Sequence, residues 1–481
     1  MLKGLEAVEL GYNFIKSENV GFRIESEYFK KEYKILKNKL LSKPHKKLLY
    51  FLSKSVQTGH TPSMQNSNFY GGNIKFIKTD NLRDNFIKPT FNHFLSEKGN
   101  NKIKRTFLKE QDIIVTIIGA SHDIIARSCI IKKEILPANI NQNIALIRVD
   151  KNKISPEFLN IYLTTRFGKK YLHYLSRQME QVNLNCREVE QVIVPLLSKK
   201  FQLLIEALVI KAHANLEKSK NLYAQAETLL LETIGLTDFK PSKEPINIKS
   251  FKNSFLTTGR LDAEYYQKKY EEIENIIKKS KLGFQNISNV AKLKNGSFIP
   301  DTFYVEKAKR AYLRIKELSW NQPINTNKVI FITDDFKASN ETTVKENDFV
   351  IATIGNTIGK INLVTKEFNE SFISNNTSRL RLTVSTDNYY FYEILFRSFF
   401  VQEQIQKEFT QTAQPKISNT SIKNIIIPII DYTKQQKIAE LVEESFRLKK
   451  ESAQLLETAK RAVEIAIETD EAEAVRFLTV D

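Results

Sequence analysis

Two long stretches without glycine or proline constrain this chain more than any other feature of its sequence. The first runs from Ser198 to Ile234 and the second from Tyr432 to Glu468, and each holds 37 residues. Apolar or small residues recur in both at alternating steps of three and four, which is the period of a coiled-coil seam. At 1.5 Å per residue each helix would extend roughly 55 Å, which is too long for an ordinary core helix.

The small residues of the two seams occupy matching positions. Moving the first stretch forward by 233 residues superimposes these pairs: Ala212 on Ser445, Ser219 on Ser452 and Ala226 on Ala459. Small side chains at matched seam positions allow two helices to approach closely. The match therefore favours mutual pairing of the two stretches over two separate amphipathic surface helices.

The rest of the chain contains the same segments twice, in the same order. The matched pairs and their offsets are Arg23–Phe29 with Arg260–Tyr266 at 237, Leu108–Gly119 with Val344–Gly355 at 236, Asn141 with Asn375 at 234, and Val194 with Ile427 at 233. An offset that drifts so little indicates a tandem duplication with small deletions in loops. A repeat of this length is a duplicated domain and not a solenoid unit.

Each repeat has a globular middle followed by a helical end. Short runs rich in Ile, Val, Phe, Tyr and Thr fill the middles, separated by Gly, Asn, Asp and Ser, as in strands and turns. Asp112–Gly119 and Asp348–Gly355 read as buried strands, and residues 158–175 and 389–406 have a helical pattern. Arg379–Val384 alternates basic and apolar residues, so we expect one face of that strand to meet solvent or DNA.

Composition indicates an anionic partner. With 73 Lys and Arg against 55 Asp and Glu, the net charge is +18, which favours nucleic acid. The alternative is a lysine-rich protein whose charge is incidental. Two cysteines imply no disulfide framework and fit a reducing cytoplasm. No apolar run reaches membrane-spanning length, and the N-terminus has no signal-peptide pattern.

Motifs for catalysis are absent from the sequence. We find no Asn-Pro-Pro-aromatic tetrapeptide of the kind an adenine N6-methyltransferase uses. Gly355–Lys360 is one residue short of a phosphate-binding loop, and Ile361 stands where Ser or Thr would bind Mg²⁺. The six His and two Cys make no metal-ligand spacing. We therefore predict no catalytic residue, cofactor site or metal site.

The chain resembles the specificity subunit of type I restriction-modification systems. The resemblance rests on RIESEYF and RLDAEYY, on the strands that end at Gly119 and Gly355, on Gln414–Ser418, and on Ile425–Ile430 leading through Gln435–Ala439 into the second long stretch. In the first half, Leu184–Val189 takes the place of the segment that contains Ile417 and Ser418. The motifs are individually weak, but they occur twice in the same order.

That resemblance implies an α+β fold with two tandem target-recognition domains, separated by two long helices that pair as an antiparallel coiled coil. The expected segments are an N-terminal helical segment 1–46, target-recognition domain 47–195, spacer helix 196–235, linker and short helix 236–283, target-recognition domain 284–430, spacer helix 431–468 and a frayed acidic tail 469–481.

The resemblance also implies a function without catalysis in this chain. Each domain would read one half of a bipartite site in double-stranded DNA, as part of a phage-defence system. Two methyltransferase subunits would bring S-adenosylmethionine and methylate adenine, and an ATP-driven restriction subunit is a further possible partner. Two other classes stay open at this point: a self-contained DNA methyltransferase or nuclease, and a coiled-coil scaffold. The DNA sequence recognised cannot be read from the chain.

Polar turns between strands are the candidate DNA-binding segments, because base readout needs donors and acceptors and phosphates need cations. In the first domain the candidates are Gln57, Thr58, His60, Ser121, His122, Arg127, Asn141, Gln142, Gln181, Asn183 and Arg187. In the second they are Lys292, Lys294, Asn295, Ser297, Asn356, Thr357, Lys360, Asn375, Asn376, Arg379, Gln411, Gln414 and Lys416.

Overall fold

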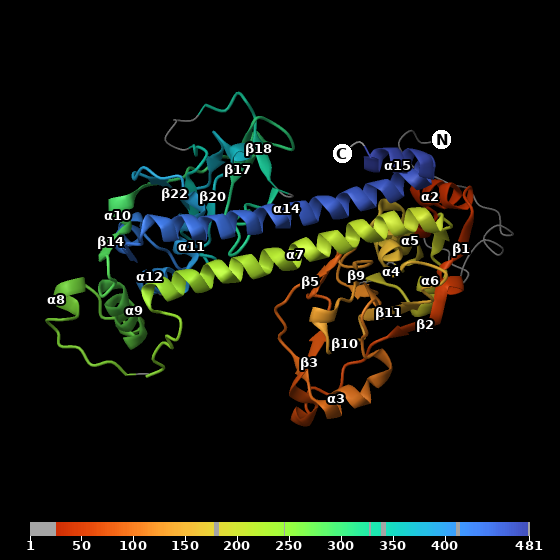
Figure 1. Ribbon diagram of the computed structural model, residues 1–481, viewed down its shortest axis with the longest axis horizontal. Coiled ribbons are helices and arrows are strands. Elements are labelled where there is room, and N and C mark those ends of the chain that lie inside the picture. The colour runs from red at the N-terminus through yellow and green to blue at the C-terminus, as the bar shows by residue number, and fades with distance from the viewer. Residues whose placement is uncertain are drawn as a thin grey trace. The chain divides into compact units, whose positions relative to one another are not determined.

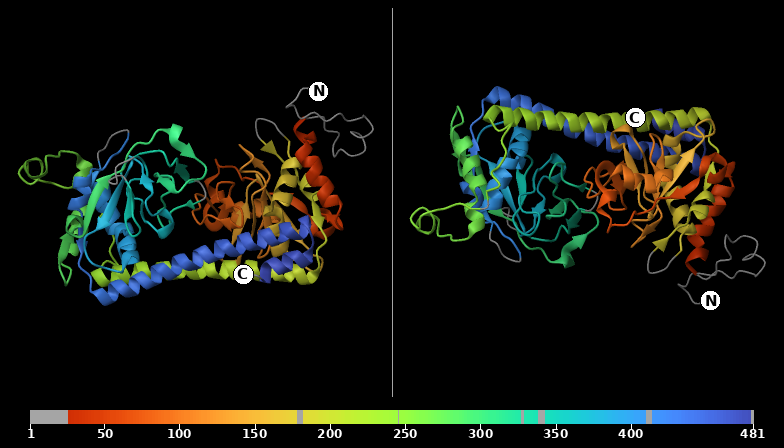
Figure 2. Two further views of the ribbon diagram at one scale, coloured as in Figure 1. Left: turned by 90° about the horizontal axis from the view of Figure 1, so that it is seen from above. Right: turned by 90° about the horizontal axis from the view of Figure 1, so that it is seen from below.

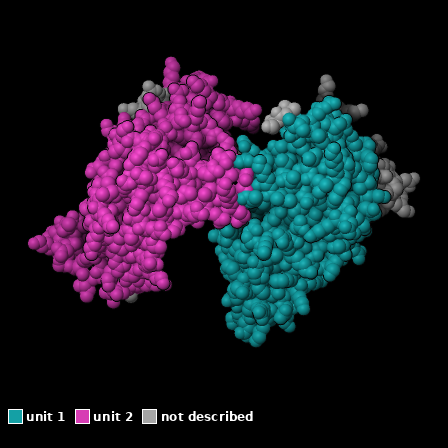
Figure 3. Space-filling view, in the orientation of Figure 1, with its two compact units in different colours: residues 1–214, 451–481 teal, residues 215–450 magenta. Residues whose placement is uncertain are grey.

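The computed structural model describes residues 26–177, 182–244, 246–326, 329–337, 343–409 and 414–479 (Figure 1). Its contacts divide the chain into two units, which Figure 3 colours separately. Unit 1 contains residues 1–214 and 451–481, and unit 2 contains residues 215–450. The seven segments drawn from the sequence stay a prediction, since this division follows contacts and not function.

Unit 1 contains a four-stranded antiparallel sheet with the strand order β2-β11-β7-β9. Its strands are β2 (Leu52–Thr58), β11 (Ile144–Val149), β7 (Ile113–Thr116) and β9 (Ser128–Ile130). All four residues of β7 are buried, as expected for a central strand that is covered on both faces. A smaller sheet has the order β10-β3-β6, from β10 (Ala138–Ile140), β3 (Tyr70–Ile77) and β6 (Phe94–Leu95).

Unit 2 repeats this arrangement. Its four-stranded sheet has the order β15-β22-β19-β20, from β15 (Ala291–Asn295), β22 (Thr377–Leu382), β19 (Phe349–Ala352) and β20 (Ile361–Leu363). The second sheet has the order β16-β18-β17-β21, from β16 (Tyr304–Val305), β18 (Ile330–Ile332), β17 (Arg310–Leu313) and β21 (Phe372–Ile373). In unit 1, β10 pairs in parallel with β3, and in unit 2, β21 pairs in parallel with β17. The duplication therefore includes the crossover between the two sheets of each unit.

Further short elements complete each repeat. In unit 1 they are α2 (Lys31–Leu41), β1 (His45–Lys47), β4 (Leu82–Arg83), β5 (Phe86–Ile87), α3 (Glu97–Lys102), β8 (Ile118–Gly119), β12 (Val182–Asn183), α6 (Cys186–Glu190) and β13 (Ile193–Pro195). In unit 2 they are α8 (Phe255–Thr258), α9 (Lys268–Lys278), β14 (Phe284–Asn286), α10 (Ile287–Val290), α13 (Asn419–Asn424) and β23 (Ile426–Pro428). β1 pairs with β13, and β14 pairs with β23. The first and last strands of each globular part therefore pair with each other.

The helical pattern near the end of each middle forms two helices and not one. They are α4 (Pro156–Thr164) and α5 (Arg166–Leu175) in unit 1, and α11 (Tyr389–Arg397) and α12 (Phe399–Glu408) in unit 2. Thr165 is extended and its side chain accepts a hydrogen bond from the Gly168 amide, so it caps α5. Ser398 takes the same place between α11 and α12. Thr165 therefore ends one helix and caps the next, whereas Ser398 separates its two helices without a side-chain cap hydrogen bond.

The two long helices form where the sequence predicts them. They are α7 (Lys199–Ile234) and α14 (Tyr432–Glu468), with 36 and 37 residues. Within unit 1 the first half of α7 contacts the second half of α14, as in the Lys211–Glu451 ion pair of 3.2 Å. Within unit 2 the second half of α7 contacts the first half of α14, as in the Ser219–Ser445 hydrogen bond of 3.0 Å. The predicted antiparallel pairing is therefore present in both units (Figures 1 and 2).

Burial follows the predicted seam. Ile205, Val209, Ala212, Ser219, Ala226 and Leu230 are buried in α7, and Ile438, Ser445, Leu448, Ser452, Ala459, Ala462 and Ala466 in α14. Each helix half joins the core of its own unit, since Ile205 and Ala459 belong to the core of unit 1 and Ala226 and Ile438 to that of unit 2. The α+β fold with two globular parts and two long paired helices is confirmed.

The structure corrects the prediction made for the acidic tail. The sequence predicts that residues after Thr469 are frayed, but Glu471–Thr479 form helix α15. The Glu471 carboxylate accepts a hydrogen bond of 2.8 Å from the Ser198 amide at the start of α7, and Ala474 is buried. Apolar contacts with the unit 1 core hold this helix in place, including those of Val475 and Leu478.

Candidate nucleic-acid interface

Three strands of unit 1 meet at one end of the larger sheet. β2 ends at Thr58, β7 ends at Thr116 and β11 begins at Ile144, and the register pairs Ala145 with Thr58 and Ile144 with Thr116. The turn that connects β10 to β11, residues 141–143, lies at the same end. The structure therefore brings together Gln57, Thr58, Asn141 and Gln142, four of the residues predicted to bind DNA.

Main-chain hydrogen bonds hold this turn from several sides. The Asn141 amide donates to the Ile77 carbonyl, the Ile144 amide to the Asn141 carbonyl, the Ile117 amide to the Asn143 carbonyl, and the Gly59 amide to the Ile144 carbonyl, at distances of 2.9 to 3.2 Å. The Thr58 hydroxyl also donates to the Gln142 carbonyl at 3.2 Å. The backbone is thus rigid where the Gln142 side chain is exposed.

Unit 2 builds the same turn from different side chains. The Ser374 amide donates to the Leu313 carbonyl, the Thr377 amide to the Ser374 carbonyl, the Thr353 amide to the Asn376 carbonyl, and the Gly296 amide to the Thr377 carbonyl, at 2.9 to 3.0 Å. Asn375 stands at the exposed apex. Each bond is the counterpart of one in unit 1, so the two domains present equivalent turns on the same backbone frame.

A glycine is required beneath each turn. A Cβ at Gly59 would lie 2.2 Å from the Ile140 carbonyl oxygen and 2.4 Å from that of Asn141. At Gly296 it would lie 2.4 Å from the Ile373 oxygen and 2.3 Å from the Ser374 oxygen. No side chain fits at these distances, so only glycine permits this close approach.

Strand register corrects one match drawn from the sequence. The sequence matches Asn141 with Asn375, but β7 pairs Thr116 with Ile144 while β19 pairs Ala352 with Thr377. Asn141 is therefore equivalent to Ser374, and Gln142 to Asn375. Both turns are rich in asparagine, so side-chain identity favoured a match one residue away from the structural one.

A second pair of segments lies beside this sheet end. In unit 1, β8 pairs with β12 through Val182 with Gly119 and Asn183 with Ile118. In unit 2, Ile354 forms a bridge with Lys416, and the Gly355 amide donates to the Pro415 carbonyl at 3.0 Å. The candidates here are exposed: Asn183 and Arg187 in unit 1, and Asn356, Gln414 and Lys416 in unit 2.

The remaining candidates are spread around these segments. His60 follows β2 and is exposed, and Ser121 and His122 lie in the loop after β8. Thr357 and Lys360 lie in the loop between β19 and β20, where burial lowers the pKa of Lys360. The Asn295 side-chain oxygen accepts from Ser378 and Asn419 at 2.9 and 2.7 Å, and Ser297 lies just beyond it. Gln181 and Gln411 lie outside the described residues.

The basic alternation of Arg379–Val384 has a structural cause that the sequence did not reveal. Lys294 and Lys292 on β15 lie opposite Arg379 and Arg381 on β22. Arg379 is only 7% exposed and donates to the Thr343 carbonyl at 2.8 Å. The expectation that this face is open to solvent or DNA is therefore wrong for Arg379.

Arg381 forms an ion pair that recurs in both domains. Its guanidinium donates twice to the Asp348 carboxylate, at 2.7 Å each, and Arg148 donates twice to Asp112 at 2.8 Å. Each aspartate also accepts from a main-chain amide three residues before it, at 2.7 Å. These pairs fix the loop before β7 and β19. The aspartate that directly precedes each buried strand is the sequence feature that indicates this ion pair.

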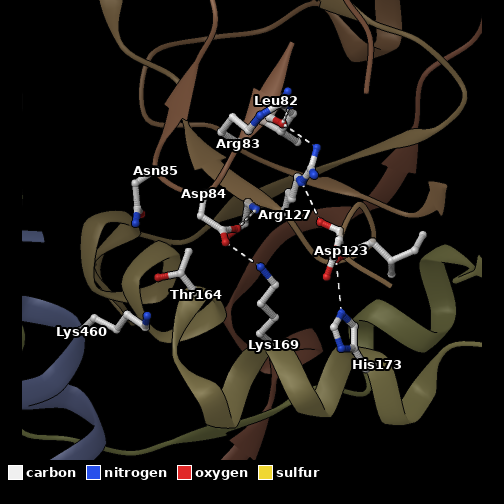
Figure 4. Close-up of polar contacts among 12 residues, drawn as sticks. Leu82, Arg83, Asp84, Asn85, Asp123, Arg127, Thr164, Lys169, His173 and Lys460 are labelled. Atoms are coloured by element: carbon white, nitrogen blue, oxygen red, sulfur yellow. Dashed lines mark hydrogen bonds and ion pairs between the residues drawn. The ribbon is translucent and has the colours of Figure 1, made fainter. Parts of the chain in front are cut away.

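Arg127 does not join the sheet-end turn. Its Nε donates to the Asp123 carbonyl at 2.8 Å, and its Nη1 shares the Leu82 carbonyl with Arg83 (Figure 4). Burial and the neighbouring Arg127 lower the pKa of Arg83. Lys169 of α5 pairs with Asp84 at 2.6 Å. This cluster fastens the loop that carries Ser121 and His122 to α5.

His122 and His173 meet at the edge of that cluster. Their rings lie 5.2 Å apart at 71°, and a ring nitrogen of His173 lies 3.3 Å from the Ile125 carbonyl oxygen. Burial is the largest cause that lowers the pKa of His173. The sequence reading did not single out His173 or Arg83, because residues 83, 122 and 173 are far apart in the chain.

Within the described ranges, no group of three or more His, Cys, Asp or Glu side chains is placed to hold a metal ion. In the same part of the chain, no helix has the length and apolar character needed to cross a membrane. Cys129 and Cys186 are both free thiols, and burial raises the pKa of Cys129 well above its usual range.

Comparison with known proteins gives one family match. Residues 279–458 match the model of the type I restriction modification DNA specificity domain. Over 156 residues the chain is 26% identical to the type I restriction enzyme EcoBI specificity subunit of Escherichia coli. That alignment covers 32% of this chain and 30% of the relative, so the matched stretch spans less than a third of either protein.

Two solved structures resemble the chain along most of its length. The S subunit of a type I restriction-modification system from M. genitalium is 12% identical, with a TM-score of 0.45, over 86% of this chain and 94% of that one. The HsdS subunit from Thermoanaerobacter tengcongensis is 13% identical, with a TM-score of 0.29, over 89% and 96%.

Proposed function

We propose, from the premise that residues 279–458 belong to the type I restriction modification DNA specificity domain family, that the whole chain is a type I specificity subunit. In this proposal each globular part reads one half of a bipartite site in double-stranded DNA. The chain itself is not catalytic. It directs adenine methylation, or restriction, by partner subunits.

The observation that carries the proposal is the duplicated turn. Residues 141–143 and 374–376 are held by equivalent main-chain hydrogen bonds, but their side chains differ. A rigid backbone with exchangeable polar side chains is what sequence readout requires, because base edges are distinguished by donor and acceptor patterns. Two such turns in one chain support the proposal that each domain recognises DNA separately.

Charge supports DNA as the ligand. The chain carries a net charge of +18, and exposed cations accompany the polar turns, among them Arg187, Lys294 and Lys416. Cations bind phosphates without regard to sequence and position the protein on the duplex. The polar turns would then supply the selectivity.

Partner subunits would supply the chemistry. Leu203 and Ile210 on α7 are each 50% exposed and lie seven residues apart, on one face of the helix. Exposed apolar side chains on one helix face are suited to a protein partner. We propose that methyltransferase subunits, which carry S-adenosylmethionine, bind the long helices, and that ATP is used only by a restriction subunit. A cytoplasmic location is part of the same proposal.

Exchange of one domain tests this function. β1 pairs with β13, so the exchanged segment runs from residue 44 to residue 196 to keep both strands together. In a complete complex that contains the segment from another specificity subunit, one half of the methylated site should change and the other should stay. The reciprocal exchange of residues 283–429 should change only the other half.

Two outcomes would contradict the proposal. One is an exchange that alters both halves together, which would mean that the domains do not read DNA separately. The other is transfer of a labelled methyl group from S-adenosylmethionine to DNA by the purified chain alone, which would make the chain an enzyme. Binding without sequence preference would instead support a scaffold.

A further inference from the structure

The two turns described above place one side chain at the same backbone position in each domain. Gln142 and Asn375 are both exposed, and both carry a carboxamide. Their neighbours are less available: Asn141 and Ser374 are buried, at 6% and 5% exposure, and Asn143 and Asn376 are half-buried. The apex residue is therefore the side chain that each turn presents outward.

The main chain around the apex leaves little freedom. In unit 1 the amide of residue 141, the carbonyl of residue 143 and the amide of residue 144 are all hydrogen-bonded, and in unit 2 so are their counterparts at residues 374, 376 and 377. The carbonyl of Gln142 accepts from the Thr58 hydroxyl. A turn held this firmly loses little backbone conformational entropy on binding, which favours recognition.

The chemistry of the side chain indicates its ligand. A carboxamide offers an N–H donor beside a carbonyl acceptor, and this pair matches N7 and the N6 amino group of adenine in the major groove. Guanine presents two acceptors on the same edge and does not match. In unit 1 the Thr61 hydroxyl donates to the Gln142 side-chain oxygen, which orients the amide. The second lone pair of that oxygen and the N–H groups stay available for the amino group and N7 of adenine.

We propose that Gln142 and Asn375 are equivalent base-reading residues, each recognising one adenine in its own half of the split site. The inference rests on the proposed function. It adds which residue of each domain reads the site, which base that residue recognises, and that the two residues are equivalent. Asn375 is shorter by one methylene than Gln142, so its domain must bring the turn closer to the base edge.

Single substitutions in the complete complex test the inference, with methylated sites mapped across a genome. Gln142→Ala should relax one A·T position in one half of the site, by roughly tenfold in discrimination. Asn375→Ala should do the same in the other half. Gln142→Glu keeps the shape but removes the N–H donors, so it should also lose the preference for adenine.

Both apex residues are exposed, so the variants should fold normally. Each serves as the control for the other, since the half that it does not touch should stay intact. Asn152→Ala, in an exposed turn after β11, should leave both halves unchanged. These controls separate loss of base readout from general loss of activity.

The possible failures are distinguishable. A wild-type complex that methylates without sequence preference would overturn the proposed function and this inference with it. A wild-type split site that stays unchanged in the Gln142 and Asn375 variants would overturn the inference alone. Relaxation at a G·C position, or in the same half for both variants, would also overturn it.

Discussion

Lys449 carries a charge that its surroundings in the helix pair disfavour. It lies on α14, and burial lowers its pKa from 10.5 to about 8, with Lys220 and Arg397 adding to the effect. Arg397 is itself paired with the buried Glu393 at 2.5 Å. Within the described part of the chain, a protonated Lys449 therefore lies among cations without a compensating charge of its own.

We expect Lys449→Met to stabilise the protein at pH 7. A lysine with a folded pKa of about 8 opposes folding while it is protonated, and the unfolded chain holds the proton up to its usual value near 10.4. The free energy of unfolding of the wild type therefore rises with pH between these values. The advantage of the Lys449→Met variant over the wild type should shrink over the same range.

Urea unfolding at pH 7 and at pH 10 measures this difference. Lys450→Met is the matched control, because Lys450 is the next residue on α14 and is exposed. It should change stability little at either pH. An equal gain from Lys449→Met at both pH values would mean that its charge is not the cause.

Ser219 and Ser445 decide how closely the two long helices approach within unit 2. Their side-chain oxygens lie 3.0 Å apart, and Ser445 also donates to the Ser219 carbonyl at 2.8 Å. They are 3% and 2% exposed. The Ser445 hydroxyl can reach the main chain of α7 only because the side chains of Ser219 and Ser445 are both small. The pair therefore fixes the local alignment of the two helices.

We expect Ser219→Leu to destabilise unit 2 by about 1–3 kcal/mol, because extra methylenes overpack a buried seam. Ser219→Ala should cost only about 1 kcal/mol, the typical contribution of one hydrogen bond. Lys218→Leu is the control on the exposed face. Chemical denaturation measures all three, and equal losses for Lys218→Leu and Ser219→Leu would contradict close packing at the seam.

The whole molecule is divided through the middle of both long helices. The boundary falls between Ala214 and Asn215 in α7 and between Lys450 and Glu451 in α14. A change of length at either point alone leaves seam residues without their counterparts. Experiments on helix length must therefore alter both helices together.

Under the proposed function, insertion of one heptad at each of these two points should lengthen the unread spacer of the DNA site. Seven residues preserve the seam period and add roughly 10 Å of helix. At about 3.4 Å per base pair this allows up to about three base pairs, and rotation about the duplex makes one to three the expected change. The half-sites themselves should stay the same.

Methylation mapping of the doubly inserted complex measures the spacer directly. Insertion into α7 alone should impair assembly, because its added seam residues have no partners. An active complex with paired insertions and an unchanged spacer would mean that the helices do not set the distance between half-sites.

The sequence alone determined the two long helices, the duplication and the family resemblance, which the match of residues 279–458 confirms. These features depend on local periodicity and on order along the chain, and both are visible without coordinates. The spacing of apolar residues in 198–234 and 432–468 predicted α7 and α14 to within one residue. Periodicity and order along the chain did not determine the roles of individual residues at the candidate interface.

Only the tertiary structure decided which polar residues act together. Strand register made Gln142 the counterpart of Asn375, and packing buried Arg379, which the sequence placed on an open face. Contacts with the unit 1 core turned the expected frayed tail into α15. The physical reason is common to all three: burial and hydrogen-bond partners come from segments distant in the chain, and local sequence carries no record of them.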